Sequence, residues 1–245
     1  MITRHHVALA LICSLIIGIA IVPFSPGLFL VLVTGTCIGS VLPDIQMTKP
    51  KKFCTRSLAW CIVQFTKFAC MPLICRCYRA IPAFRAGTCD KRVTHSVPGV
   101  LFVSGILTGI IYSSAALSGT HVPDPANAFL AGIFLGMILH LAEDLCTRKG
   151  ITPLFPFSDL RITGSIRPCD AGDRRIGHFH VQHCSVLILF FTLCAAGMIP
   201  SRLVIPAGFT GIAACVVFMI SLSSVKISPG DFQPSPGTQA VPNAG

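Results

Sequence analysis

Six stretches of apolar residues dominate the chain, and each approaches the length of about 20 residues that crosses a bilayer as a helix. They are residues 7–24, 27–43, 97–117, 127–145, 184–200 and 203–222. Backbone N–H and C=O groups in hydrocarbon must be hydrogen-bonded within the protein, so such stretches fold as helices. Hydrophobic residues make up 53% of the chain and charged residues 11%, with a mean hydropathy of +0.76, which excludes a water-soluble domain. We therefore expect an all-α polytopic membrane protein with about six transmembrane helices.

The first two apolar stretches lie almost end to end, separated only around Ser25. Arg4 before the first stretch is also typical of a cleaved signal peptide, but a second apolar stretch follows at once, which favours a membrane hairpin. The second stretch is short and rich in glycine. The pair is therefore predicted to form a tight helical hairpin with a short second helix, and this hairpin need not cross the bilayer completely.

Basic residues predict the orientation of the chain in the membrane. With six spans, the N-terminus, residues 44–96, residues 146–183 and the segment after 223 share one side. Of the 19 Lys and Arg residues, 18 fall on that side and only Arg202 on the other. The positive-inside rule then places the N-terminus, both long loops and the C-terminus in the cytoplasm. The net charge of +10 is accordingly interpreted as topology and not as a nucleic-acid-binding surface.

Residues 1–227 are expected to form a single integral-membrane domain. Within its first long loop, residues 59–79 are apolar but are broken by Lys67 and Pro72, and they end in basic residues. This pattern predicts an interfacial amphipathic helix lying on anionic lipid. Residues 228–245 have too little apolar content to pack, which predicts a disordered tail.

The cysteines indicate no disulfide framework and no zinc site. The 13 cysteines are odd in number, and no CxxC pair occurs among them, so neither a disulfide framework nor a zinc ribbon is indicated. Cys75 and Cys77 in the CRC segment lack the partner pair that a zinc site requires. Reduced thiols facing the cytosol are therefore expected.

The clearest metal-ligand spacing is that of His140 and Asp144, which lie four residues apart on one predicted helix and so share a face. Glu143 lies on an adjacent part of that face. Both carboxylates occupy the last turn of the helix, where the helix dipole disfavours negative charge and a bound cation would offset that cost. The alternative is a helix end whose carboxylates pair with Arg148 and Lys149.

Further polar side chains occur at the same ends of other predicted helices. Asp44 follows Pro43 at the end of the second apolar stretch, where it either serves a turn or binds a ligand. His5 and His6 precede the first stretch by one helical turn or less. Because ionisable groups at membrane depth are costly, their gathering at one end of the helices makes them candidates for a common site.

A similar cluster precedes the third apolar stretch. His95 comes directly before a helix that Ser96 is suited to cap. Lys91 and Arg92 lie beside it and either bind an anionic substrate or anchor to lipid headgroups. These residues are predicted to join the same site.

Three segments resemble the YdjM-like family of membrane-bound metal-dependent hydrolases. They are PDI at 43–45, THS at 94–96 and HLAEDLCTRKGITPLFPF at 140–157, and they follow the order of the family over roughly residues 1–165. The family is distantly similar to zinc-dependent phospholipase C and P1-type nucleases. The resemblance thus implies a divalent-metal phosphoesterase-like site facing the cytoplasm, with an anionic lipid or another phosphorylated molecule as substrate.

The resemblance also implies roles for individual residues. The implied metal ligands are His5 or His6, Asp44, His95, His140 and Asp144. Asp90 or Glu143 would orient the attacking water as a catalytic group, and zinc is the expected cofactor, with manganese or magnesium as alternatives. Gln46 and Asp90 depart from the family pattern, which has aspartate and histidine there.

Two alternatives to a hydrolase remain. A catalytically degenerate membrane scaffold would account for Gln46 and Asp90. A metal- or proton-coupled transporter would place His140 and Asp144 on a permeation path. His178, His180 and His183 lie outside the matched segments and are interpreted as a polar lead into the fifth span, although His180 and His183 have the spacing to share a helix face.

Overall fold

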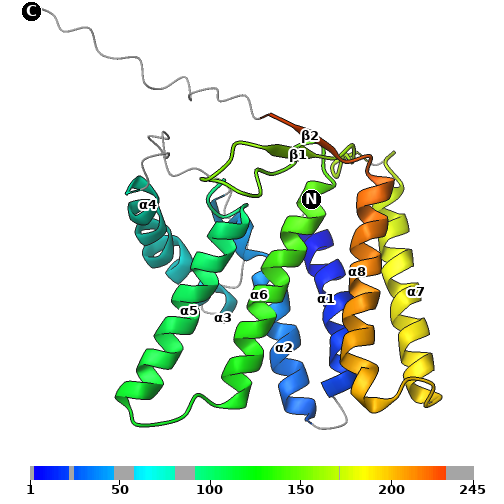
Figure 1. Cartoon of the computed structure of the whole chain (residues 1–245), viewed down its shortest axis with the longest axis horizontal. Helices are drawn as coiled ribbons and strands as arrows, with labels where there is room; N and C mark the ends of the chain where they lie inside the picture. Colours follow the sequence, from blue (N-terminus) through cyan, green and yellow to red (C-terminus); the bar gives the residue numbers. More distant parts are fainter. Residues whose placement is uncertain (1–2, 22–24, 47–57, 81–91, 171, 230–245) are drawn as a thin grey trace, which may run out of the picture.

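The computed structural model describes residues 3–21, 25–46, 58–80, 92–170 and 172–229, and it consists mainly of long helices that run side by side (Figure 1). The six longest are α1 (Thr3–Ile21), α2 (Pro26–Gly39), α5 (Val97–Leu117), α6 (Asp124–Leu145), α7 (Arg175–Ala195) and α8 (Val204–Leu222). Among the described residues, five helical segments are long and apolar enough to cross a membrane. The prediction of an all-α polytopic membrane protein is confirmed.

The first two helices, α1 and α2, form the predicted N-terminal hairpin. Ser25 caps α2 by accepting a hydrogen bond from Leu28 N at 3.3 Å. After α2 the chain continues through the 3-10 helix η1 (Leu42–Gln46), so that the apolar segment Pro26–Asp44 is long enough to span. The α-helix α2 has 14 residues and α1 has 19, so the prediction that the second helix is the short one is confirmed.

The fifth span begins nine residues before its predicted start, at Arg175 and not at 184. Asp173 Oδ1 accepts a hydrogen bond from Arg175 N at 3.2 Å, which satisfies a donor at the beginning of α7. The helix then tolerates its polar first turns because His180 and His183 each direct Nδ1 to a carbonyl four residues earlier. Gly197, with φ of +67°, follows the end of the helix. The histidines that lead into the fifth span are thus part of the helix, and the predicted start of the span at residue 184 is wrong.

Helices α2 and α6 approach each other closely through glycines. Gly35 and Gly39 face α6, and Gly132 and Gly136 face α2. A Cβ atom at Gly136 would collide with the carbonyl oxygen of Thr36 on α2. Small residues four apart let membrane helices pack backbone to backbone. This packing brings the end of α2, and Asp44 beyond it, next to the last turns of α6.

The predicted interfacial segment is helical. It forms α3 (Leu58–Phe65), the π-helical turn η2 (Thr66–Cys70) and α4 (Met71–Arg79), which run obliquely beside the bundle (Figure 1). Ile74 and Tyr78 are buried against the hydrophobic core near α5, whereas Phe68 is 71% exposed. Contact with anionic lipid stays a prediction.

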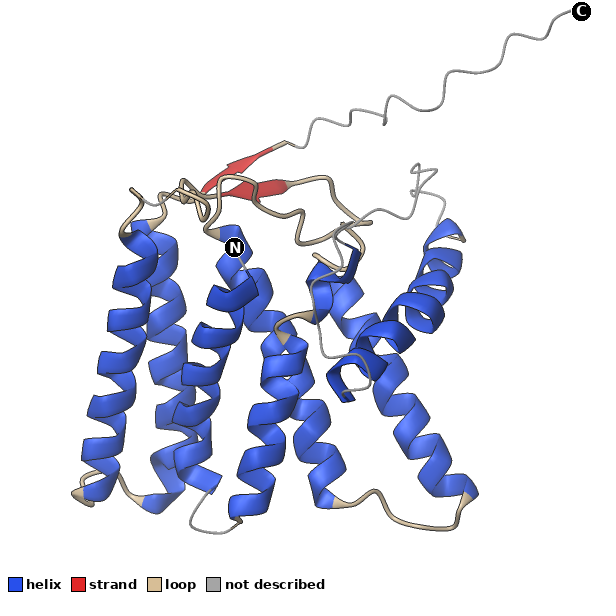
Figure 2. Cartoon of the chain, turned by 180° about the vertical axis from the view of Figure 1, so that it is seen from behind, coloured by secondary structure: helices blue, strands red, loops and turns tan. Residues whose placement is uncertain are grey.

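Loops and a short sheet cover the end of the bundle at which α6 stops (Figure 2). The antiparallel strands β1 (Arg161–Thr163) and β2 (Lys226–Ser228) pair with Ile162 opposite Ile227. Ser228 lies in β2, and residues 230–245 of the predicted tail lie outside the described residues.

An ion pair lies at the start of α7. The Arg175 guanidinium, 2.7 Å from Asp173, holds the pKa of the Asp173 carboxyl well below its usual range.

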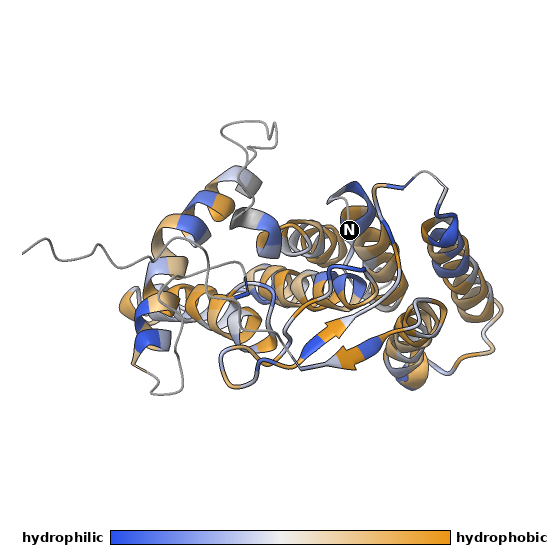
Figure 3. Ribbon diagram, turned by 90° about the horizontal axis from the view of Figure 1, so that it is seen from above, coloured by the Kyte–Doolittle hydropathy of each residue, from blue (hydrophilic) through white to orange (hydrophobic). Residues whose placement is uncertain are grey.

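Apolar positions predominate along the helices, as Figure 3 shows from above.

Ten of the described cysteines are free, but Cys75 is disulfide-bonded. The expectation of reduced thiols is therefore wrong for this residue.

Candidate metal centre

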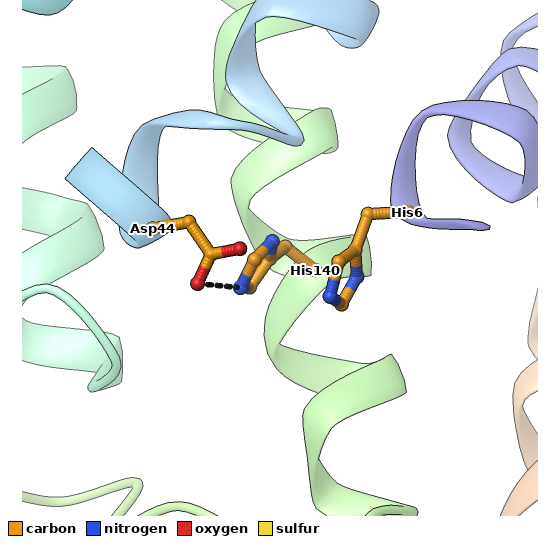
Figure 4. Close-up of side chains that lie close together, drawn as sticks. All are labelled: His6, Asp44 and His140. Carbon is orange, nitrogen blue, oxygen red and sulfur yellow. Dashed lines mark ion pairs between the residues drawn. The ribbon is translucent and has the colours of Figure 1, made fainter. Parts of the chain in front are cut away.

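Four separate elements bring the predicted ligands together at one end of the bundle. The ligands are His6 from α1, Asp44 from η1, His95 from the turn before α5, and His140 and Asp144 from α6. Figure 4 shows the His140 ring between Asp44 and His6. The potential ligand atoms of His6, Asp44 and His140 lie within 4.8 Å of one another, as do those of His95, His140 and Asp144. The sequence-predicted group is thus brought together by the fold.

The two aspartates lie among the imidazole rings. Asp144 has one carboxylate oxygen 3.5 Å from His6 Nε2 and the other 3.5 Å from His140 Nε2 and 3.7 Å from His95 Nε2. Asp44 Oδ1 lies 3.5 Å from His95 Nε2 and 4.0 Å from His140 Nε2. These nitrogen–oxygen separations are longer than those of good hydrogen bonds, and each carboxylate faces more than one imidazole ring.

The His140 ring has a defined orientation. Its Nδ1 lies 2.7 Å from the carbonyl oxygen of Ser40, which can only accept a proton, so Nδ1 is the donor. In the neutral ring, Nε2 therefore carries the lone pair and faces Asp44 and Asp144. This atom is buried and has no hydrogen-bond partner among the described residues. A lone pair facing two carboxylates is unfavourable unless a cation lies between them.

His6 shows the same arrangement with a different neighbour. Its Nδ1 lies at an ion-pair distance of 2.8 Å from Glu143 Oε2, while Nε2 faces Asp144. The His6 and His140 rings are stacked with their centroids 3.9 Å apart. Two stacked imidazolium ions would repel each other, so one shared cation satisfies both rings better than two protons.

Burial differs across the group. The side chains of His6 and His140 are fully buried, whereas those of Asp44, His95 and Asp144 are 9%, 12% and 13% exposed. Solvent therefore reaches the group from the side of His95 and Asp144. Inner ligands that are buried and outer ligands that are partly open are typical of a centre that keeps one position for a substrate or water.

Other residues predicted for the site take different positions. His5 makes an edge-on ring contact with His180, with centroids 5.4 Å apart, so of the two N-terminal histidines it is His6 that joins the group. Arg92 lies over the ring of Phe155 at 4.8 Å. Asp90, Lys91 and the side chain of Gln46 lie outside the described residues, and their predicted roles stay predictions.

The histidines of α7 do not enter the group among the described residues. His183 is 1% exposed and its Nδ1 contacts the carbonyl oxygen of Phe179 at 2.7 Å. His178 is exposed on the same helix. These positions favour a structural role for His183 and leave the metal candidates to α1, η1, α6 and the turn before α5.

Two features that position the site were not identified from the sequence. The carbonyl of Ser40 orients His140, and no side-chain pattern indicates a backbone acceptor. The glycines of GTCIG at 35–39 and GIFLG at 132–136 set the approach of α2 to α6, and their spacing of four is a recognisable signal of close membrane-helix packing.

Comparison with known proteins identifies the family. The family described as YdjM inner membrane protein has a sequence model that matches residues 1–228. No curated protein and no solved structure matches the chain. The matched region includes all the helices described above and the whole candidate centre. The chain therefore belongs to the YdjM inner membrane protein family.

Proposed function

We propose that this protein is a membrane-bound metal-dependent hydrolase whose divalent cation is held by His6, Asp44, His95, His140 and Asp144. The observation that carries the proposal is the arrangement of three imidazole Nε2 atoms around two carboxylates, with His140 Nε2 buried and without a hydrogen-bond partner among the described residues. Such a donor set suits zinc, with manganese or magnesium as alternatives.

The shared ligand argues for a single ion. Both candidate groups of ligands contain His140. Its Nδ1 is occupied by the Ser40 carbonyl, so only Nε2 remains to bind a metal. One Nε2 lone pair binds one cation, and we therefore propose one ion shared by the five side chains.

The residues around the ion supply binding and orientation. A divalent cation in this position would supply Lewis acidity toward a phosphoryl or acyl oxygen and would acidify water. The fully buried His6 and His140 would hold its inner side, and His95 and Asp144 border the partly exposed side of the centre. A phosphoester or lipid-linked substrate would approach from that side. The proposal places this end of the bundle in the cytoplasm, following the distribution of basic residues.

A first prediction tests the ion itself. Purified wild-type protein should hold about one divalent ion per chain, and His140→Ala and Asp144→Ala should lose it, because each removes a ligand from a shared ion. Elemental analysis of the protein in detergent, after zinc or manganese is offered, measures the content.

The matched control is His183→Ala. His183 resembles His140 in burial and in directing Nδ1 to a carbonyl at 2.7 Å, but it lies outside the candidate groups. This variant should keep its metal. A wild-type protein that stays metal-free would contradict the hydrolase proposal, as would equal metal loss in all three variants.

A further inference from the structure

We propose that Thr94 is a positioning residue of the metal centre, whose single hydroxyl group orients His95 and holds the turn that carries Asp44. The inference rests on the proposed function, because it describes how two ligands of that centre are held. Thr94 itself is 4% exposed and is not among the candidate ligands.

The hydroxyl group joins two distant segments. Thr94 Oγ1 donates a hydrogen bond of 2.8 Å to the carbonyl oxygen of Pro43, which lies 51 positions away in the sequence and directly precedes Asp44. The same Oγ1 lies 3.2 Å from His95 Nδ1. Thr94 thus contacts the residue next to one ligand and the ring of another.

Counting protons assigns the tautomer of His95. A threonine hydroxyl has one proton, and a carbonyl oxygen can only accept one, so the proton of Thr94 is used on Pro43. The hydroxyl oxygen can then only accept from His95, which makes Nδ1 the protonated nitrogen. In the neutral ring, Nε2 therefore carries the lone pair and faces Asp44 at 3.5 Å and Asp144 at 3.7 Å. This is the tautomer that binds a metal through Nε2.

The surrounding turn holds Thr94 in place. Ser96 Oγ donates to the carbonyl of Val93 at 3.0 Å and accepts from Gly99 N at 3.1 Å, which begins α5. Val97 N donates to the carbonyl of Pro153 at 2.8 Å. With its backbone anchored on both sides, the Thr94 hydroxyl can orient His95 and η1 together, as outer-shell groups do for metal ligands.

Replacing the hydroxyl group tests the inference. Thr94→Val keeps the shape of the side chain but removes the hydroxyl, and it should raise the apparent Kd for zinc about 10- to 100-fold in a chelator competition on the detergent-purified chain. Thr94→Ser restores the hydroxyl and should restore most of the affinity. The matched control is Thr36→Val, since Thr36 is buried and its Oγ1 donates to a carbonyl, that of Leu32, at 2.9 Å. The control should bind zinc as the wild type does.

The outcomes separate the two proposals. A wild-type protein that binds no zinc overturns the proposed function and this inference with it. Zinc binding by Thr94→Val with wild-type affinity, or a Thr94→Ser variant as weak as Thr94→Val, overturns the inference alone.

A second measurement reads the tautomer in the wild-type protein, and a variant serves only to assign the signal. Nitrogen-15 NMR of histidine-labelled, metal-free protein reports which ring nitrogen carries the proton, and the His95 signal is assigned by its loss in His95→Gln. The Nδ1-protonated tautomer is expected. The Nε2-protonated tautomer would overturn the inference.

Discussion

Glu143 illustrates how one ionisable side chain inside the bundle can be read in two ways. Sequence reasoning made it a candidate for orienting the attacking water. In the structure it is 1% exposed and its Oε2 faces His6 Nδ1, on the edge of the ring away from Asp144. A carboxylate behind a histidine ligand fixes the orientation of the ring and strengthens the ligand. This position favours a role in holding His6.

Substitution of Glu143 separates the two roles. Glu143→Leu removes the carboxylate and should weaken zinc binding about 10- to 100-fold, whereas Glu143→Gln keeps an oxygen near Nδ1 and should lose less. Chelator competition on both variants measures the affinities. If Glu143→Gln keeps full metal affinity while hydrolysis of a phosphoester substrate is abolished, the residue acts on the water and the positioning role is wrong.

At the scale of the helices, the contact between α2 and α6 decides whether the candidate metal centre can form. Asp44 lies in η1, directly after α2, and His140 and Asp144 lie in the last turns of α6, so the separation of α2 and α6 sets the separation of the ligands. The GxxxG spacing on both helices permits the close approach. The i, i+4 spacing of His140 and Asp144 was recognisable from the sequence, but the partner helix was not.

Filling this interface should separate the helices. Gly136→Val places side-chain atoms against the Thr36 carbonyl, and we expect a destabilisation of at least about 1–3 kcal/mol together with weaker zinc binding. The free energy of unfolding is measured by SDS titration in mixed micelles. Gly109→Val on α5 is the control, because a Cβ atom at Gly109 would have no heavy atom within 4 Å apart from the neighbouring backbone of its own helix. The free energy of unfolding of this variant should change by less than about 0.5 kcal/mol. Equal stability of the two variants would contradict the packing argument.

At the scale of the whole molecule, the candidate centre, the short sheet and the loop between α6 and α7 gather at one end of the bundle (Figure 1). The turns between α5 and α6 and between α7 and α8 lie at the other end. Lys and Arg residues divide 18 to 1 between the two predicted sides. Because basic residues are retained in the cytoplasm during insertion, this division predicts a centre that faces the cytoplasm.

Reporter fusions test this orientation. Alkaline phosphatase inserted at Gly119, in the turn after α5, should be active because it is exported, and green fluorescent protein fused after Ser228 should fluoresce in the cytoplasm. Phosphatase fused after Ser228 serves as the reciprocal control and should be inactive. The reverse pattern would move the centre to the outer face and contradict the proposed cytoplasmic substrate.

Local physics explains why much of the fold could be predicted from the sequence. Apolar length alone identifies the spans, because the backbone of a membrane segment must satisfy its own hydrogen bonds, and Val97–Leu117 has the predicted bounds. The face shared by His140 and Asp144 follows from helical periodicity. The start of α7 was missed because Asp173 and the backbone contacts of His180 and His183 keep a polar segment helical.

Contacts between distant segments were decided by the tertiary structure alone. Three such contacts join residues many positions apart. They are the ring contact of His5 with His180, which leaves His6 to the group, the contact of Glu143 with His6, and the hydrogen bond from Thr94 to Pro43. The sequence determined which helices form and which faces carry ligands, since these depend on neighbouring residues. Only the packing of the helices determined which ligand atoms meet, because distances between elements depend on how closely their surfaces fit.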